Sequence, residues 1–198
     1  MAELLIFHHA QGLTSGVRAF GERMATAGHT VHVPDLYEGR TFETLDEGIA
    51  HAGEIGFGTV IARGVAAAEG LPDALAYVGF SLGVLPAQAL AQKRPGTTAA
   101  ALFHSCVPPE EFGSWPAGVP LQIHIMDRDP LASPPETDLE TARRLDAEST
   151  RRRSSPIPAT STSSRTRACR PTTRRPPGRR RSASSNCSAE CSSSTATT

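Results

Sequence analysis

The sequence predicts an α/β fold built on a mostly parallel, doubly wound sheet. Over the first 148 or so residues, short apolar runs alternate with amphipathic stretches, as is typical of strands joined by crossover helices. Several of these runs are apolar at consecutive positions, as strands buried on both faces require. At 198 residues the chain has room for one domain of ordinary size.

Five strands and about four helices follow one another along this part of the chain. The expected strands are residues 4–7, 30–33, 75–78, 99–103 and 121–125, and the expected helices are residues 16–27, 45–69, 82–92 and 137–148. Gly53, Gly56 and Gly58 interrupt the second helical segment and are expected to divide it. Pro86 is tolerated because it falls in the first turn of its helix. Ligands are therefore expected at the carboxyl ends of the strands.

The composition changes abruptly near residue 150. Residues 1–150 hold 9 Lys and Arg against 19 Asp and Glu, whereas residues 151–198 hold 11 Arg, 12 Ser, 8 Thr and 5 Pro but one acidic residue, Glu190. With Ile157 as its only large aliphatic residue, this segment cannot bury enough apolar surface to offset the entropy of ordering it. We expect a globular domain over 1–148 and an Arg/Ser/Thr/Pro-rich segment over 149–198, either disordered or frameshifted.

The protein is expected to be cytoplasmic and to need no metal or other cofactor. The apolar run at 4–7 is too short for a signal peptide, and no stretch approaches the roughly 20 apolar residues of a membrane span. Cys106 is the only cysteine before the composition change, which excludes a disulfide framework there. Cys169, Cys187 and Cys191 have no accompanying His and match no zinc pattern. A membrane partner is not expected, and oligomeric state leaves no signal.

Residues 79–83, Gly-Phe-Ser-Leu-Gly, match the pattern G-x-S-x-G between an expected strand and an expected helix. Glycines two residues before and after Ser81 let strand and helix pass closely at a tight turn, which lifts the hydroxyl above the sheet. The N-terminus of the helix supplies N–H groups for a developing oxyanion. A chance match is the alternative, but the position between strand and helix favours a nucleophile elbow. The sequence thus predicts Ser81 as a nucleophile.

Five ordered segments resemble the dienelactone hydrolase family, from about residue 3 to residue 148. They read LLIFHHAQGLT (4–14), VPDLYEGRTF (33–42), GFSLG (79–83), LFHSCVPP (102–109) and HIMDRDP (124–130). The resemblance implies an α/β-hydrolase fold and hydrolysis of esters, lactones or thioesters. Dienelactone hydrolase itself has a cysteine nucleophile, whereas this chain has Ser81, and a hydroxyl needs a stronger base partner than a thiol.

The resemblance also implies most of a catalytic site. It points to Asp129 as the acid, with Asp127 as the alternative, while a loop-capping role would be the simpler explanation for either. The oxyanion would be held by the N–H of Leu82 and by that of Ala10, or less favourably Gln11.

Three histidines and one arginine are candidates for the substrate pocket. His9 aligns with a glutamate of dienelactone hydrolase, which argues against carrying over that enzyme's activation mechanism. His8, His9 and His104 are expected to line the pocket or to end strands rather than to catalyse. Arg40 could receive a substrate carboxylate through its fork of donors, although a solvated surface arginine is the simpler interpretation.

The base is missing from its expected place. The order Ser, acid, His of this fold puts the base after Asp129, but the chain has no His after His124. Either another His does the work or the chain lacks its base. Read one base out of register, the codons for residues 157–164 are compatible with Tyr-Pro-Gly-Asp-x-His and two large apolar residues, similar to the family's His loop. We interpret the segment from about 149 on as a frameshifted hydrolase C-terminus, without the last strand and helix.

Two other functions compete with hydrolysis. A catalytically dead hydrolase fold could be a binding protein, and the 11 Arg of the C-terminal segment could bind nucleic acid through phosphate contacts. No aromatic residues are interleaved with those arginines for base stacking. The expected partner is therefore a small-molecule ester or lactone rather than a nucleic acid.

Overall fold

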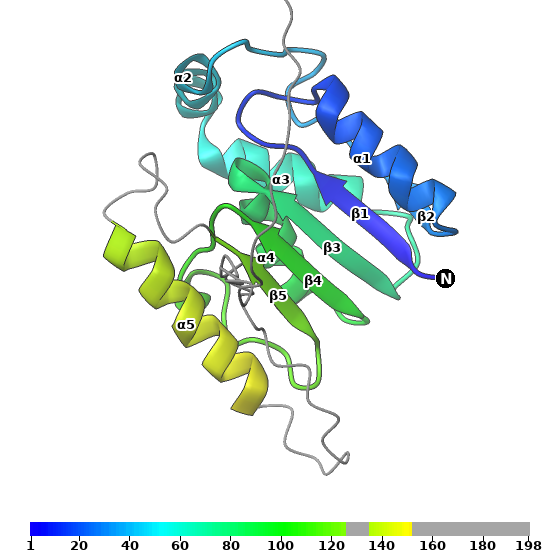
Figure 1. Ribbon diagram of the computed structural model, residues 1–198, viewed down its shortest axis with the longest axis vertical. Helices are drawn as coiled ribbons and strands as arrows, with labels where there is room; N and C mark the ends of the chain where they lie inside the picture. The colour runs from blue at the N-terminus through cyan, green and yellow to red at the C-terminus, as the bar shows by residue number, and fades with distance from the viewer. Residues whose placement is uncertain (126–134, 152–198) are drawn as a thin grey trace, which may run out of the picture. The chain divides into compact units, whose positions relative to one another are not determined.

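The strands predicted from the apolar runs form one five-stranded sheet, in the order β2-β1-β3-β4-β5 (Figure 1). The computed structural model describes the backbone of residues 1–125 and 135–151, and the side chains of residues 1–125 and 139–150. The strands are β1 (Glu3–Phe7), β2 (Thr30–His32), β3 (Leu75–Phe80), β4 (Ala99–Phe103) and β5 (Leu121–His124). Every neighbouring pair is parallel, so the carboxyl ends of the strands meet at one edge.

Helices connect these strands in the order that a doubly wound α/β fold requires. Within the described ranges they are α1 (Ser15–Thr26), α2 (Leu45–Ile55), α3 (Phe57–Ala67), α4 (Val84–Lys93) and α5 (Pro135–Arg151), together with one-turn 3-10 helices η1 (Ser81–Gly83) and η2 (Pro109–Glu111). The predicted α/β fold is confirmed. None of the helices described is long and apolar enough to cross a membrane; a cytoplasmic location stays a prediction.

Each face of the sheet has its own apolar cluster. On one face, Phe20 and Met24 of α1 pack against Leu4 and Ile6 of β1. On the other face, α3 and α4 cover a larger cluster that contains Phe7 (Figure 1). Five of the six residues of β3 are buried. The consecutive apolar positions in the sequence therefore reflect burial on both sides of a parallel sheet.

The helical segment predicted over 45–69 divides at one glycine rather than three. Gly56 has φ +83°, a conformation that residues with side chains rarely adopt, and it separates α2 from α3. Gly53 and Gly58 lie within the two helices, where a side chain would meet open space. The expectation that all three interrupt the segment was wrong because only the residue at the bend needs a positive φ.

A capping box starts α2. The hydroxyl of Thr44 accepts the N–H of Glu47 at 3.3 Å, and the carboxylate of Glu47 accepts the N–H of Thr44 at 3.1 Å. Two N–H groups at the helix start are thereby satisfied.

The last described helix is longer than predicted. α5 runs over residues 135–151 rather than 137–148, so it continues past residue 149, where the atypical segment was expected to begin. Leu145 of α5 is fully buried, and the carboxylate of Glu148 accepts the N–H of Trp115 at 3.0 Å. The remainder of the 149–198 segment lies outside the described residues, and its character stays a prediction.

Candidate active site

The predicted nucleophile, Ser81, lies at the turn between β3 and α4, beyond the carboxyl end of β3. Its φ of +48° is left-handed. Such a conformation costs a residue with a side chain on the order of 1–3 kcal/mol and gathers at functional sites. The residue is half-buried. It is therefore neither sealed in the core nor placed in the middle of a helix, and its turn has the backbone strain of a nucleophile elbow.

Both glycines of the motif are required by close contacts between main chains. A Cβ on Gly79 would lie 2.6 Å from the carbonyl oxygen of Gly83 and 2.7 Å from Cα of Val84. A Cβ on Gly83 would lie 2.5 Å from the carbonyl oxygen of Phe7 and 2.6 Å from that of His8. Real Cβ atoms essentially never approach other atoms within 3.0 Å. Gly79 therefore allows the turn to close, and Gly83 allows the turn to pack directly against the end of β1.

Two main-chain N–H groups are predicted to hold the oxyanion, those of Leu82 and Ala10. Leu82 follows Ser81 at the start of η1, where the first N–H groups of a helix have no partner within the helix. Ala10 lies in the loop after β1, the strand that pairs with β3. The Gln11 N–H, the alternative to Ala10, is already donated to Nδ1 of His9 at 3.2 Å. The Gln11 N–H is therefore already engaged, and Ala10 as an oxyanion donor stays a prediction.

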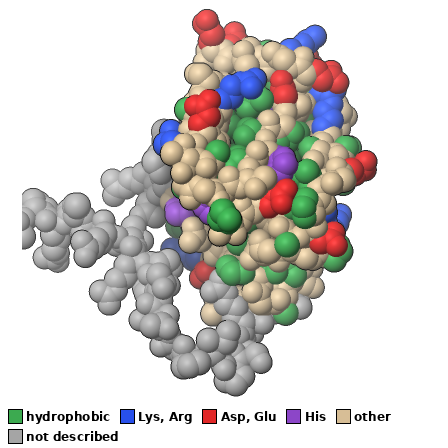
Figure 2. Space-filling model, turned by 90° about the vertical axis from the view of Figure 1, so that its right-hand side faces the viewer, with side chains coloured by type: hydrophobic (Ala, Val, Ile, Leu, Met, Phe, Trp, Pro, Cys, Tyr) green, Lys and Arg blue, Asp and Glu red, His purple; other side chains and the backbone are tan. Residues whose placement is uncertain are grey.

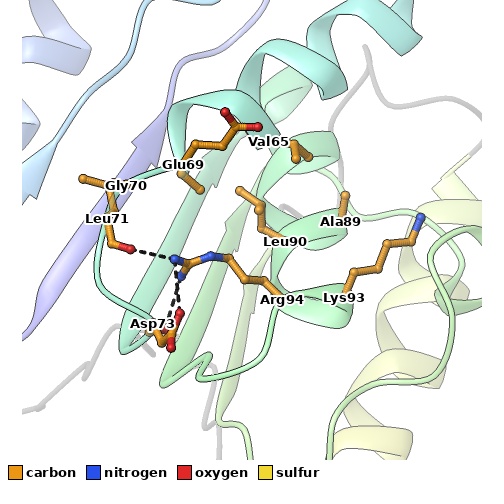
Figure 3. A pocket seen from close by; sticks show the side chains of 10 residues that line it. Val65, Glu69, Gly70, Leu71, Asp73, Ala89, Leu90, Lys93 and Arg94 are labelled. Atoms are coloured by element: carbon orange, nitrogen blue, oxygen red, sulfur yellow. Dashed lines mark hydrogen bonds and ion pairs between the residues drawn. The ribbon is translucent and has the colours of Figure 1, made fainter.

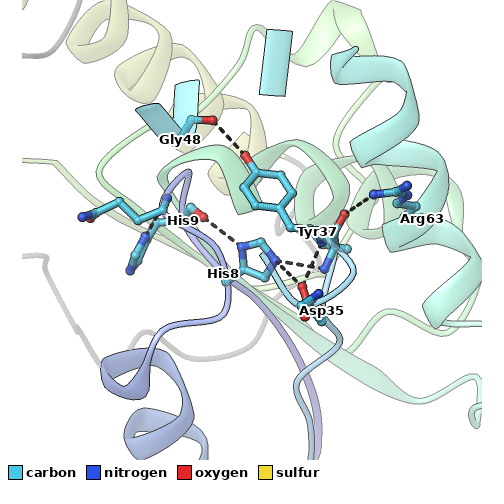
Figure 4. Close-up of polar contacts among 9 residues, drawn as sticks. His8, His9, Asp35, Tyr37, Gly48 and Arg63 are labelled. Atoms are coloured by element: carbon cyan, nitrogen blue, oxygen red, sulfur yellow. Dashed lines mark hydrogen bonds and ion pairs between the residues drawn. The ribbon is translucent and has the colours of Figure 1, made fainter. Parts of the chain in front are cut away.

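Both ring nitrogens of His9 are engaged in holding this loop (Figure 4). Since Nδ1 accepts the N–H of Gln11, it carries no proton, and Nε2 then donates to Oγ1 of Thr14 at 3.3 Å. Burial, and secondarily the charge of His104, lowers the pKa of His9. The ring is therefore kept neutral, and it fastens the loop that presents Ala10.

His8 is fully buried and connects two loops (Figure 4). Its Nδ1 donates to the carbonyl oxygen of His9 at 2.8 Å, and its Nε2 accepts the N–H of Leu36 at 2.9 Å. Burial lowers the pKa of His8, although Asp35 lies 3.7 Å from Nε2 and opposes that shift. His8 is thus a neutral residue at a strand end that joins the loops after β1 and β2, one of the two non-catalytic roles expected for it.

His104 follows β4, the strand on the other side of β3. Like Ser81 it has a left-handed backbone, with φ +68°. Its N–H donates to the carbonyl oxygen of His124 at 2.8 Å, which fixes its main chain to β5, while the residue as a whole is exposed. Ser81, His9 and His104 therefore share the carboxyl edge of the sheet.

Arg40 lies in the loop after β2, which is anchored on two sides (Figure 4). The hydroxyl of Tyr37 donates to the carbonyl oxygen of Gly48 at 3.3 Å, and Arg63 donates to that of Leu36 at 2.7 Å. Arg40 itself is exposed. Its loop is close to the loop after β1, but the role of Arg40 toward a substrate carboxylate stays a prediction.

The sequence did not single out Gln88, a fully buried residue of α4. Its Nε2 donates to the carbonyl oxygen of Val107 at 2.8 Å, and its Oε1 accepts the N–H of Val107 at 3.1 Å. Gln92, one turn later, donates to the carbonyl oxygen of Pro109 at 3.0 Å. The loop after β4 is thus held against α4, the helix that follows the turn at Ser81. A buried glutamine must find such partners, which was the only signal available in the sequence.

Two clefts of the described part lie away from Ser81. One, of about 500 Å³, lies at the amino end of β3 between the last turns of α3 and α4, with Asp73 and Arg94 in its wall (Figure 3). The other, of about 630 Å³, is lined by residues of η2 and α5, among them Glu110 and Arg144. Neither is lined by a residue predicted to act in catalysis.

The predicted acid, Asp129, and its alternative, Asp127, lie outside the described residues. In the part of the chain that is described, no group of three or more His, Cys, Asp and Glu side chains could hold a metal ion. On the face seen in Figure 2, acidic and basic side chains are interspersed rather than gathered into one basic patch.

Comparisons with known proteins bear on the family and the fold. Residues 2–149 match the family model of the dienelactone hydrolase family. A dienelactone hydrolase-like promiscuous phosphotriesterase from metagenomic libraries has a similar structure, with TM-score 0.54, 19% identity, and alignment over 74% of this chain and 66% of that chain. A candidate dienelactone hydrolase from Klebsiella pneumoniae subsp. pneumoniae gives TM-score 0.51, 20% identity and 75% and 70% coverage.

At these identities, the similarity to solved structures supports the fold, and this chain spans only 66% of the first structure's length. No curated protein matches its sequence. The family match, in contrast, covers most of the chain and includes the turn at Ser81. The chain belongs to the dienelactone hydrolase family.

Proposed function

We propose that this protein hydrolyses carboxylic esters, lactones or thioesters with Ser81 as the nucleophile. One observation carries the proposal: Ser81 adopts φ +48° between two glycines, 79 and 83, that no other residue could replace without a main-chain clash. Such strain is expected where a hydroxyl must be presented to a substrate. Membership of the family supports hydrolase chemistry.

In the proposed reaction, Oγ of Ser81 attacks the carbonyl carbon, and the N–H groups of Leu82 and Ala10 bind the resulting oxyanion. Removal of one donor of this kind typically costs about 10²- to 10³-fold in rate. Asp129 is the proposed acid that orients the base.

The proposed substrate pocket lies above the carboxyl edge of the sheet. His9 and His104 would line it, and Arg40, on the neighbouring loop, would bind a carboxylate if the substrate carries one. The predicted substrate is a small molecule, and no cofactor is needed for this chemistry.

The family's base has no counterpart beyond His124 in this chain. We propose that residues from about 149 on are a frameshifted reading of a hydrolase C-terminus. Loss of a triad base that no other residue replaces lowers the rate by about 10⁴- to 10⁶-fold. Resequencing the gene across the codons for residues 145–155 tests this interpretation; two clean reads without a missing or extra base would contradict it.

A fluorophosphonate probe tests the nucleophile in the full chain. We expect the probe to label the protein, mass spectrometry to map the label to Ser81, and Ser81→Ala to abolish labelling. Ser15→Ala, a change at an exposed serine of α1, is the matched control and should label normally. Equal labelling of the Ser81→Ala variant and the unmodified protein would refute the proposal. It would favour the catalytically dead binding protein, which the absence of a His after His124 also favours.

A further inference from the structure

Ser81 needs a base, and the histidines of this sequence are candidates for it. All seven lie within the described residues: His8, His9, His29, His32, His51, His104 and His124. The question of which one accepts the proton rests on the proposed function of Ser81. It can be answered from the position and the ring partners of each histidine.

Three histidines lie on other parts of the domain and have partners there. Nδ1 of His29 accepts the N–H of Ala2 at 3.3 Å, before β2 begins. His32 lies on the edge strand β2, and its Nε2 is 2.8 Å from a carboxylate oxygen of Glu3. His51 is buried on α2, 3.7 Å from a carboxylate one turn along the helix. None of the three follows a strand next to Ser81.

Two histidines lie next to the nucleophile turn but have no free ring nitrogen. The rings of His8 and His9 each accept one main-chain N–H and donate to one oxygen. A base must hold an unshared lone pair toward the hydroxyl, so neither ring is suited to accept the proton of Ser81.

His124 is unsuitable because of its position. It is the last residue of β5, which is separated from β3 by β4, and it pairs in register with Phe103. Its ring stacks on that of Phe103, with centroids 4.6 Å apart and planes 7° apart. The ring therefore lies along the sheet rather than over its carboxyl edge.

His104 remains, and its position is the required one. Phe80 pairs in register with Phe103, so Ser81 and His104 are the next residues on two adjacent parallel strands. Both have left-handed backbones, with φ +48° and +68°. His104 is exposed, and its ring makes no hydrogen bond within the described residues.

His104 and His9 follow the two strands on either side of β3. His9 follows β1 and His104 follows β4, so the end of β3 separates them. Burial, and secondarily the charge of His104, lowers the pKa of His9. His9 and His104 therefore flank the end of β3, where Ser81 forms its turn.

We propose that His104 is the general base for Ser81 in this chain, because the two residues follow paired positions on adjacent parallel strands and the ring of His104 makes no hydrogen bond to the described residues. As Oγ of Ser81 bonds to the ester carbonyl carbon, its proton passes to the unprotonated nitrogen of His104. When the C–O bond to the alcohol breaks, His104 returns that proton to the leaving oxygen. Water, deprotonated by the same ring, then releases the acid and restores the serine hydroxyl.

The test compares fluorophosphonate labelling rates and p-nitrophenyl acetate turnover in the full chain. We expect His104→Ala to lower the labelling rate constant and kcat by about 10²- to 10⁴-fold, the usual contribution of a general base, with little change in KM. His104→Asn should behave alike, and since Asn tolerates a left-handed backbone, this variant guards against misfolding. Added imidazole should restore part of the rate in His104→Ala but none in Ser81→Ala.

His124→Ala is the matched control, an exposed histidine at the end of the next strand, and should retain the full rate. If Ser81→Ala abolishes labelling while His104→Asn keeps the full rate, the base assignment is overturned and the nucleophile stands. The same holds if His124→Ala is the variant that slows. If the unmodified chain labels no faster than Ser81→Ala, both the proposed function and the base assignment fail.

Discussion

Replacement of Gly83 by alanine should damage both the stability and the reactivity of this protein. The new Cβ would lie 2.5 Å from the carbonyl oxygen of Phe7 and 2.6 Å from that of His8. To reach the 3.0 Å limit of real contacts, the turn must move away from β1 by at least 0.5 Å, the difference between 3.0 and 2.5 Å. Both contacted atoms belong to main chain held in or beside the sheet, so they cannot rotate away.

Two magnitudes follow from this displacement. Overpacking of this kind typically costs about 1–3 kcal/mol, a sizeable part of a usual stability of about 5–15 kcal/mol. A misplacement of about 1 Å at a reacting group can cost about 10²-fold in rate, so a shift of half that size should slow labelling of Ser81 by roughly tenfold.

Urea unfolding and the fluorophosphonate labelling rate measure the two effects. Gly53→Ala is the control, because a Cβ there meets open space within α2, and replacing a helical glycine should stabilise by about 0.5–1 kcal/mol. An unfolding midpoint and labelling rate of Gly83→Ala equal to those of the unmodified protein would show that the contact with β1 does not constrain the turn.

Three further changes probe the surroundings of the site. Gln88→Ala would leave the N–H and C=O of Val107 without partners, which costs about 1–3 kcal/mol for each group that water does not reach. Urea unfolding should detect this loss of stability. An unchanged unfolding midpoint would show that the hydrogen bonds between Gln88 and Val107 do not stabilise the fold. Because burial lowers the pKa of His8, the unfolded state binds a proton more readily than the folded state, so the free energy of unfolding should fall as pH drops below about 6.5. Unfolding at several pH values should show a weaker dependence for His8→Gln, and equal slopes would argue against a neutral buried ring. Thr44→Ala removes the capping-box hydroxyl and should cost about 1 kcal/mol, read from thermal unfolding, with Thr26→Ala, at the end of α1, as a control that should change little.

The strand and helix pattern was predictable because it depends on burial, and burial dictates which positions are apolar. Each of the five predicted strands is present, with ends shifted by at most two residues. The glycines of the 45–69 segment were harder to interpret. A bend requires one residue with positive φ, but the sequence does not say which of several glycines the neighbouring helices will place there.

The site was predictable only as far as residue type reflects function. The glycines on either side of Ser81 indicate a close approach of main chains, and the structure identifies the atoms that approach. The hydrogen bonds made by His8 and Gln88 could not be predicted from the sequence. Their partners are main-chain groups in loops, and every residue carries such groups. The engagement of the Gln11 N–H was equally hidden, since it depends on where the imidazole of His9 points.

The hydrogen bonds between Gln88 of α4 and the loop after β4 bear on how this protein can evolve. Gln88 holds only the peptide groups of Val107, not its side chain. Substitutions along that loop can therefore accumulate by neutral drift without unfastening it from the helix that supports Ser81. Under the proposed function, this loop can change to recognise new substrates while Ser81 keeps its place.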